Sequence, residues 1–464
     1  MAERVIPFIG SPTQRATGDT DQRYVNLYFE VHRNDALKEQ TVYCNKRPGI
    51  SSFSAPGGTS TGRGLYFWRG STYSVAGHVL WTGTISTAIN SSTGRVWFAE
   101  RHVDTGAQIV VVSDGIANYN VTSTNVVSTV NAATDADYPV SNLGPVIFMD
   151  GYIFQAQSNG RIWNSALNAS SVWTATAFLT ADTHGGDLEA IYIQKDQIVA
   201  LTKNRTEFYF NNGNPTGSPL LRIDQNTIYA GCASKNSLAW FGEVGCYVGE
   251  NSEGGRAVYR LGSLKLGDIS TPTINRFLNA EGPSISSCTA WMAPINGQVI
   301  YCLNLQAANK SFTYGVETGL WSEWRDTGAS RFNCVSATYG NGITYLQDTS
   351  SGQIYTVSSN TYTDKASTYS VYVQTNKSSF GTSKRKVESA VSLIGDQTTG
   401  NVDVYVSDDD FATSTYAGVI DMSLQRKRVT RLGSFYERSH LFEYRGSSSF
   451  RVQAYAPDIE GTRS

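Results

Sequence analysis

The hydrophobic positions of the chain form short runs that are separated by residues typical of tight turns. The pattern is clearest between residues 144 and 173. There, three apolar runs alternate with two turn dipeptides, in the order 146–148, Asp150-Gly151, 152–154, Asn159-Gly160 and 162–163. Asp-Gly and Asn-Gly provide the positive φ angles of hairpin turns, and the runs are rich in residues that favour strands. The stretch therefore predicts a β-meander.

Similar units recur on both sides of this stretch, at 62–83, 94–115, 189–215, 237–262, 289–324 and 333–357. In the unit at 189–215, Lys195-Asp196 and Lys203-Asn204 are the turn candidates. A repeat of roughly forty to fifty residues is typical of β-propeller blades, and such a sheet buries its faces only by stacking on its neighbours. We therefore predict an all-β chain in which residues 61–360 form a β-propeller of about six or seven blades. Its aromatic side chains are expected to pack between blades, with stacking on sugars or bases as the alternative.

The first sixty residues do not fit the repeat. They are predicted to form an extended arm with two strands, around Tyr24–Val31 and Thr41–Cys44, followed by a turn at Pro48-Gly49. The segment 54–64, rich in Gly, Ser and Thr, marks the boundary to the propeller. The arm is therefore assigned to residues 1–60.

Helices are scarce in the pattern, and one is predicted, at 269–282. Thr271 is suited to cap it, Pro272 to occupy its first position and Gly282 to end it. We expect this short helix to link two blades.

After about residue 360 the pattern becomes a strict alternation of apolar and polar residues. Val402, Val404 and Val406 alternate with polar positions, and further strands follow at intervals of eight to twelve residues. This spacing is typical of a β-sandwich. Residues 361–464 are therefore predicted to form a separate C-terminal β-sandwich.

Basic residues are frequent in this last region. They are Lys384, Arg385, Lys386, Arg426, Lys427, Arg428, Arg431, Arg438, Arg445 and Arg451. Because they alternate with apolar residues, they are expected on one solvent face of a sheet. Two interpretations stay open: a merely solvated face, and a docking surface for an acidic partner.

Charge and cysteine content narrow the classes of function. Only 16% of the 464 residues are charged and the formal net charge is −2, so nothing favours avid binding of nucleic acid or anionic membranes. The six cysteines include no Cys-x-x-Cys pair and are expected to be small buried hydrophobes in a reducing compartment. No secretory signal or membrane span is indicated. We expect a soluble chain that folds in a cytoplasm, without cofactor or metal.

Catalytic motifs are weak or misplaced. The Gly-x-Ser-x-Gly pattern at 58–62 lies in the connector rather than on a strand-to-helix turn, and the five histidines are far apart. The loop 182–187 and the acidic turn 407–410 are expected to be exposed turns rather than cation sites. The sequence therefore predicts a protein that is not an enzyme and has no catalytic residues.

Motifs along almost the whole chain carry a resemblance to a known family. They are Tyr24-Val25-Asn26-Leu27-Tyr28, Lys46-Arg47-Pro48-Gly49-Ile50, Gly62-Arg63-Gly64-Leu65, the basic strand 428–434 and the apolar strand from Phe450-Arg451-Val452. In this order they resemble the tail hub (nozzle) proteins of short-tailed phages, often described as packaged-DNA stabilisation proteins.

The resemblance implies a structural protein of the virion tail. Its subunits would form a ring, with six as the expected number, that extends the DNA channel below the portal and adaptor proteins. The ring would retain packaged DNA, conduct it at ejection with only transient non-specific contact, and meet a needle, plug or tailspike protein. The family supplies no catalytic residues. As candidate interface residues we take Lys384, Arg385, Lys386, Arg426, Lys427, Arg428, Arg431, Tyr24 and Asn26.

Two other classes of protein remain possible on the sequence. A glycan-binding or glycan-hydrolysing propeller is the first, and a hydrolase would need two carboxylates that flank one bond. Asp187, Glu189, Glu207 and Glu243 are candidates, but no spacing singles out a pair. The second is a propeller scaffold that binds peptides.

Overall fold

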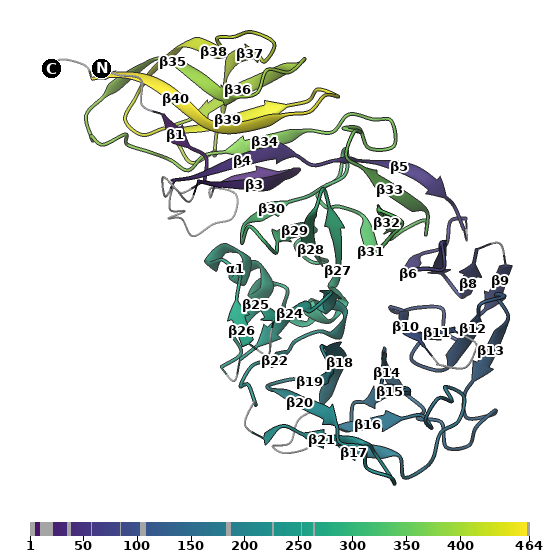
Figure 1. Ribbon diagram of the computed structural model, residues 1–464. Helices are drawn as coiled ribbons and strands as arrows, with labels where there is room; N and C mark the ends of the chain where they lie inside the picture. The colour runs from purple at the N-terminus through teal and green to yellow at the C-terminus, as the bar shows by residue number, and fades with distance from the viewer. Residues whose placement is uncertain are drawn as a thin grey trace.

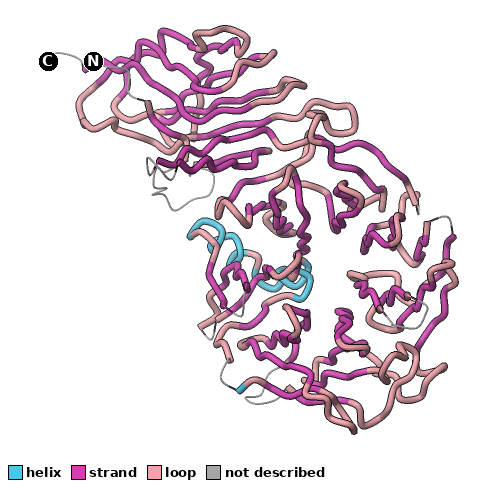
Figure 2. Tube along the Cα trace, viewed as in Figure 1, coloured by secondary structure: helices cyan, strands magenta, loops and turns pink. Residues whose placement is uncertain are grey.

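The computed structural model describes residues 5–9, 22–34, 39–56, 58–83, 85–102, 108–181, 187–224, 227–251, 253–262 and 265–461. Within them the regular structure is almost entirely β (Figure 2). Seven small sheets stand in a ring, and a two-layered unit lies beside the ring (Figure 1). The predicted all-β fold, a propeller with a C-terminal sandwich, is confirmed.

The seven sheets are the blades of the propeller, and their first strands lie nearest the centre of the ring (Figure 1). Blade 1 consists of β6 (Gly62–Trp68), β7 (Ser71–Ala76), β8 (Val79–Thr82) and β9 (Ile85–Ala88). Blade 2 consists of β10 (Trp97–Arg101), β11 (Ile109–Ser113), β12 (Asn118–Thr122) and β13 (Val127–Val130). Blade 3 consists of β14 (Asn142–Met149), β15 (Tyr152–Gln157), β16 (Arg161–Asn164) and β17 (Phe178–Thr180). Blade 4 consists of β18 (Leu188–Gln194), β19 (Gln197–Thr202), β20 (Thr206–Asn211) and β21 (Leu220–Arg222).

The remaining blades are less regular. Blade 5 consists of β22 (Gly231–Cys232), β23 (Ala239–Phe241), β24 (Val244–Glu250), β25 (Arg256–Gly262) and β26 (Lys265–Asp268), and its inner edge is broken by the 3₁₀ turn η2 (Lys235–Ser237). Blade 6 consists of β27 (Thr289–Ile295), β28 (Gln298–Leu305), β29 (Lys310–Gly315) and β30 (Trp321–Glu323). Blade 7 combines β31 (Cys334–Gly340), β32 (Ile343–Asp348) and β33 (Ile354–Ser358) with β5 (Gly49–Ser54) from the start of the chain.

The hairpin turns follow from the local sequence. Asp150 and Gly151 have φ angles of 49° and 88°, which a two-residue turn of the predicted kind requires. At Asn159-Gly160 only the glycine is left-handed, with φ 87°, and at Lys195-Asp196 only the lysine is, with φ 54°. The meander predicted at 144–173 is confirmed as β14 to β16.

Strand β5 closes the propeller. It pairs antiparallel with β33, with Ile50 opposite Val357, and so completes the last blade with residues that precede the first. Blade 7 in turn packs on blade 1 through β31 and β6. The closure ties two ends of the ring together, so opening it requires breaking a strand pair as well as an apolar contact.

Two buried glutamines link neighbouring blades. In β15 and β32 a buried glutamine is followed five residues later by glycine, Gly160 and Gly352. Gln347 accepts a hydrogen bond from the amide of Gly64 and donates one to the carbonyl of Val75, both in blade 1 and both at 3.0 Å. Gln155 of blade 3 donates from its Nε2 to Ser113 Oγ at 3.1 Å and to Asn118 Oδ1 at 2.7 Å, both in the preceding blade 2. Polar side chains as well as apolar packing therefore join these pairs of blades.

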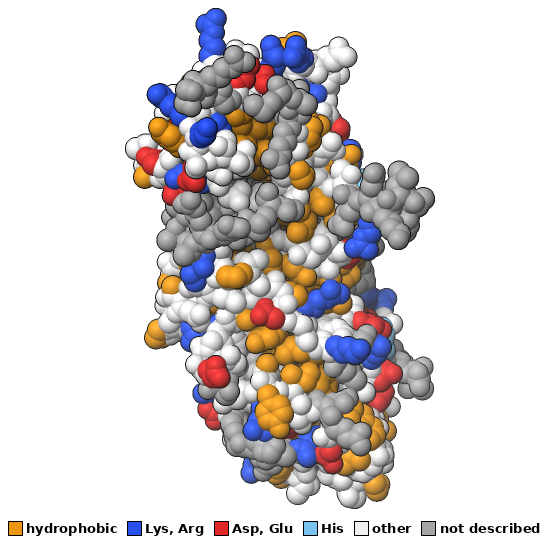
Figure 3. Space-filling view, turned by 90° about the vertical axis from the view of Figure 1, so that its left-hand side faces the viewer, with side chains coloured by type: hydrophobic (Ala, Val, Ile, Leu, Met, Phe, Trp, Pro, Cys, Tyr) orange, Lys and Arg blue, Asp and Glu red, His pale blue; other side chains and the backbone are white. Residues whose placement is uncertain are grey.

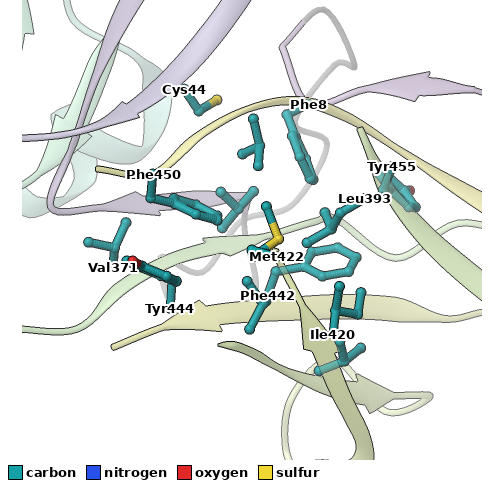
Figure 4. Close-up of a cluster of buried hydrophobic side chains, with 14 of the residues drawn as sticks. Phe8, Cys44, Val371, Leu393, Ile420, Met422, Phe442, Tyr444, Phe450 and Tyr455 are labelled. Carbon is teal, nitrogen blue, oxygen red and sulfur yellow. The ribbon is translucent and has the colours of Figure 1, made fainter. Parts of the chain in front are cut away.

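The two-layered unit is a β-sandwich. Its first sheet holds β1 (Ile6–Pro7), β3 (Leu27–Asn34), β4 (Glu39–Lys46), β40 (Arg451–Gly461), β35 (Lys386–Gly395) and β38 (Arg428–Phe435). Its second sheet holds β2 (Arg23–Val25), β34 (Val371–Gln374), β39 (Ser439–Tyr444), β36 (Asn401–Ser407) and β37 (Thr415–Asp421). Apolar side chains from both sheets, including Leu393, Phe442 and Tyr455, point toward one another in its core, and Phe8 lies against the last two (Figure 4).

The N-terminal region does not form the separate arm that was predicted for residues 1–60. Strands β3 and β4 pair within the sandwich, whereas β5 belongs to blade 7. The single strand predicted at Tyr24–Val31 is also two strands, since Asn26 has φ 57° and turns the chain from one sheet into the other. Strand β2 then pairs with β30 of blade 6 and with β34, so one nine-stranded sheet runs from the propeller into the sandwich.

The predicted helix is present as α1 (Pro272–Ala280) beside β25 of blade 5 (Figure 2). The side chain of Thr271 caps it by accepting a hydrogen bond from the amide of Ile274, and Gly282 follows with φ 54°. A second 3₁₀ segment, η3 (Gly282–Ser287), leads into blade 6. Among the described residues, no helix is long and apolar enough to cross a membrane.

Candidate functional site: the sandwich edge and the propeller axis

One edge of the sandwich presents five of the seven basic residues taken as candidate interface residues. Strand β38 ends the first sheet, in the order β3-β4-β40-β35-β38, and β37 ends the second sheet beside it (Figure 1). Exposed basic residues lie on or next to these strands: Lys384, Arg385, Arg426, Arg428 and Arg431. Exposed apolar side chains lie among them: Tyr416, Val419, Leu424 and Tyr436. We call strands β37 and β38 with these nine residues the sandwich edge.

Two of the predicted interface lysines are buried instead. Lys386 is 1% exposed, and its Nζ donates to the carbonyls of Thr382 at 2.6 Å and Lys384 at 2.8 Å. Burial lowers its pKa. Lys427 is 9% exposed and donates to the carbonyl of Gly395 at 3.0 Å. Since both ammonium groups satisfy backbone carbonyls of their own subunit, they cannot serve as docking charges.

The other basic residues of the region are compensated locally. Arg438 is buried and pairs with Glu388 and Asp408, while Arg445 pairs with Glu443. Residues 361–464 contain 13 Lys and Arg against 12 Asp and Glu, so the sandwich region as a whole is almost neutral. The positive charge is therefore a local property of the sandwich edge.

Tyr24 and Asn26 lie inside the chain rather than on an interface. The hydroxyl of Tyr24 donates to the carbonyl of Phe8 at 2.6 Å, and burial raises the pKa of Tyr24 well above its usual value. Asn26 is 1% exposed; its Nδ2 donates to the carbonyl of Ser370 and its Oδ1 accepts from Arg47 and from the amide of Arg325. Both side chains were predicted to contact a neighbouring subunit, but their hydrogen bonds are made within their own chain.

Asn26 belongs to a junction centred on Arg47. The guanidinium of Arg47 is fully buried and pairs with both carboxylate oxygens of Asp364. It lies over the rings of Phe332, at 4.9 Å, and Tyr369, at 4.1 Å. Burial acts to lower the pKa of Arg47, but the Asp364 carboxylate outweighs it and the net shift is upward. This junction joins the N-terminal region, blades 6 and 7, and the sandwich.

The described residues show no arrangement typical of a catalytic or metal site. They hold no group of three or more His, Cys, Asp or Glu suited to a metal ion, and all six cysteines are buried thiols. Of the candidate cation loop 182–187, residues 182–186 lie outside the described residues, and Asp187 pairs with Lys203. In the acidic turn, Asp409 accepts from the amide of Thr413 and Asp408 pairs with Arg438.

The four carboxylates considered for glycan hydrolysis have separate surroundings. Asp187 pairs with Lys203 at 3.0 Å, and Glu243 lies 3.8 Å from Lys195. Glu207 is buried and accepts from the hydroxyl of Tyr209, which does not suit it to reach a sugar. Burial raises the pKa of Glu189. These four carboxylates therefore show no arrangement typical of the acid and nucleophile of a glycoside hydrolase.

The propeller axis is crossed by side chains. Trp97 of blade 2 stacks on Trp240 of blade 5, with ring centroids 6.0 Å apart, and Tyr192 of blade 4 also stacks on Trp240. Blades 2 and 5 lie on opposite sides of the ring (Figure 1). A Cβ at Gly144, which has φ 105°, would come within 2.9 Å of the Trp97 ring, so glycine is needed there.

What remains open at the axis is a pocket of about 330 Å³. Such a volume suits a small molecule, not a polymer. The aromatic residues of the repeats were predicted to pack between blades; the contact of Trp97 with Trp240 shows that some also pack across the centre.

One family model matches most of the chain and agrees with the propeller fold. A family model described as "Bacteriophage P22 Gp10, beta-propeller" (Phage_stabilise) matches residues 5–362. The search of curated proteins found no match. Similar solved structures include the computationally designed Ika8 protein, with 13% identity over 67% of this chain and 99% of that one and a TM-score of 0.40. A streptogramin B lyase has 11% identity over 67% of this chain and 97% of that one, with a TM-score of 0.43. A virginiamycin B lyase from Staphylococcus aureus has 10% identity over 67% of this chain and 98% of that one, with a TM-score of 0.43.

Proposed function

Because the chain belongs to the Phage_stabilise family of bacteriophage β-propeller proteins, we propose that it is a tail hub (nozzle) subunit of the virion. The match confirms the family resemblance that the sequence motifs indicated. In the proposal, six copies form a closed ring that continues the DNA channel below the portal and adaptor. The ring retains the packaged genome and conducts it at ejection, and a needle, plug or tailspike protein contacts its outer end.

The observation that carries this proposal is the family match over residues 5–362, which includes the propeller and the N-terminal strands of the sandwich. The sandwich edge supports a ring. A closed ring needs a heterologous interface, in which one surface of each subunit meets a different surface of the next. Two edge strands with exposed basic and apolar side chains provide one such surface, because edge strands carry unpaired backbone groups.

The filled propeller axis bears on the path of the DNA. The pocket of about 330 Å³ between Trp97 and the neighbouring blades is closed by side chains from opposite sides. A nucleic acid therefore has no route through the centre of a single propeller. In the proposed ring the channel lies between subunits.

The sparse charge of the chain suits such a conduit. Lysine and arginine that neutralise phosphates bind DNA tightly and in a salt-dependent way, which would stall its movement. Only 16% of the residues are charged, and on the face over α1 and the outer strands of blades 4 to 6 positive and negative side chains are scattered among uncharged ones (Figure 3).

Loss of the chain from infected cells tests the role in retention. Particles assembled without it are expected to package DNA and then release it, so heads isolated from the lysate contain little DNA. The measurement is the DNA content of purified particles with and without the chain supplied from a plasmid. Full heads that hold their DNA without the chain contradict the proposal.

A further inference from the structure

Aromatic side chains line a large part of the pocket at the propeller axis. Tyr66 of blade 1 stacks on Phe98 of blade 2 at 5.5 Å, and Trp97 stacks on Trp240 at 6.0 Å. The lining comes from blades 1, 2, 5, 6 and 7. Flat apolar walls of this kind stack favourably on a planar ring.

A single charged group, Arg95, lines the same pocket. Its guanidinium lies over the Trp97 ring at 4.1 Å, and its Nη1 donates to the carbonyls of Asn236 at 3.1 Å and Leu238 at 3.0 Å. Among the described residues, no carboxylate forms an ion pair with Arg95, and its Nε and Nη2 have no acceptor. Burial lowers the pKa of Arg95 to about 10, so the group is still protonated at neutral pH.

The Arg95 side chain is half-buried, and the pocket lining offers no acidic side chain to balance its charge. Arg95 has two adjacent nitrogens, Nε and Nη2, without a protein partner, and this fork matches the two oxygens of a carboxylate. The aromatic walls supply the remaining contact area.

We propose that the axial pocket binds a small planar organic carboxylate, with its carboxylate on Arg95 and its ring against the half-buried aromatic side chains of Tyr66, Phe98 and Phe241. The volume of about 330 Å³ lies at the lower end of the range for small-molecule sites. The inference concerns the isolated chain and does not rest on the proposed role in a phage tail.

A neutral sugar fits this pocket less well. Sugars need several hydrogen-bonding groups; besides Arg95, the lining holds the aliphatic hydroxyls of Ser336 and Thr338, with tyrosine hydroxyls and indole N–H groups at its aromatic residues. Each hydroxyl oxygen already accepts a hydrogen bond from a backbone amide, Leu65 for Ser336 and Phe67 for Thr338. The site therefore favours charge and planarity over hydroxyl recognition.

Isothermal titration calorimetry of the purified chain with 2-naphthoate and with 2-naphthamide tests the proposal. The two probes share a ring system and differ in the carboxylate. We expect the acid to bind at least about tenfold more tightly than the amide, as one charge-assisted pair would provide. Arg95→Met should remove this preference and leave weak, equal binding of both probes, whereas Arg95→Lys should retain part of it.

Thermal melts of both variants show whether they remain folded, because Arg95 also bridges two blades. The comparison of acid and amide on the unmodified chain decides the matter even if Arg95→Met does not fold. Equal binding of the two probes, no binding of either, or tighter binding of glucose than of 2-naphthoate overturns the proposal.

Discussion

Replacing Arg47 by methionine is expected to lower the free energy of unfolding by about 3–5 kcal/mol, the usual effect of breaking a buried ion pair. The methionine side chain fills similar space but leaves the carboxylate of Asp364, which is 4% exposed, buried without its partner. It also removes the hydrogen bond to Asn26, at the point where the chain passes from one sheet to another. Urea denaturation of the purified variant measures the change.

Two matched variants sharpen this test. Arg445→Met removes an ion pair of the same type with Glu443, but the Arg445 side chain is 60% exposed, and we expect a change of about 1 kcal/mol or less. Adding Asp364→Leu to Arg47→Met should restore part of the loss, because no unpaired charge then remains buried. If Arg47→Met unfolds at the same urea concentration as the unmodified chain, the junction does not have the structural importance assigned to it.

Reversing the charge of the sandwich edge is expected to abolish ring assembly while the subunit stays folded. The variant carries Arg426→Glu, Arg428→Glu and Arg431→Glu, all at exposed positions. Lys427 is left unchanged, since it is buried and its reversal would disturb the fold. Like charges that meet across an interface weaken binding by several kcal/mol. We therefore expect no assembly of the variant at micromolar concentration.

The measurement is the mass of the purified variant by light scattering, with circular dichroism as the check on folding. The control reverses three exposed basic residues of the propeller, Arg161, Lys195 and Lys203, and should assemble as the unmodified chain does. A sandwich-edge variant that assembles as well as this control shows that the interface lies elsewhere.

The fold was largely predictable because propeller blades are local structures. Each hairpin depends on a few neighbouring residues, such as Asp150-Gly151, and the helix at 272–280 depends on Thr271 and Pro272. The distribution of the N-terminal strands was not predictable in this way. Strand β5 pairs with β33 some three hundred residues away, and no local pattern records that choice.

The candidate interface was predictable only in part. Alternation placed the basic residues on one solvent face, and this holds for Arg426, Arg428 and Arg431. A β-bulge interrupts the pairing of β35 with β38 between Glu388 and Ala390, so strict alternation fails along this edge. Lys386 is buried because it lies at the strand start and bonds to carbonyls of the preceding loop.

Two internal positions carried no sequence signal of their role. Asn26 was predicted to be an interface residue, but it is buried at a turn, with φ 57°. Asparagine is common at such left-handed positions, but its presence alone does not identify one. Arg95 follows a glycine in an ordinary blade motif, and only the three-dimensional contact with blade 5 distinguishes it.

The most direct test of the central claim, that this chain is a ring-forming subunit, is electron microscopy of the purified protein combined with native mass spectrometry. We expect closed rings with a central hole and a mass of six times the 50.6 kDa subunit. A monomer at all concentrations, or open filaments without a closed form, would contradict it.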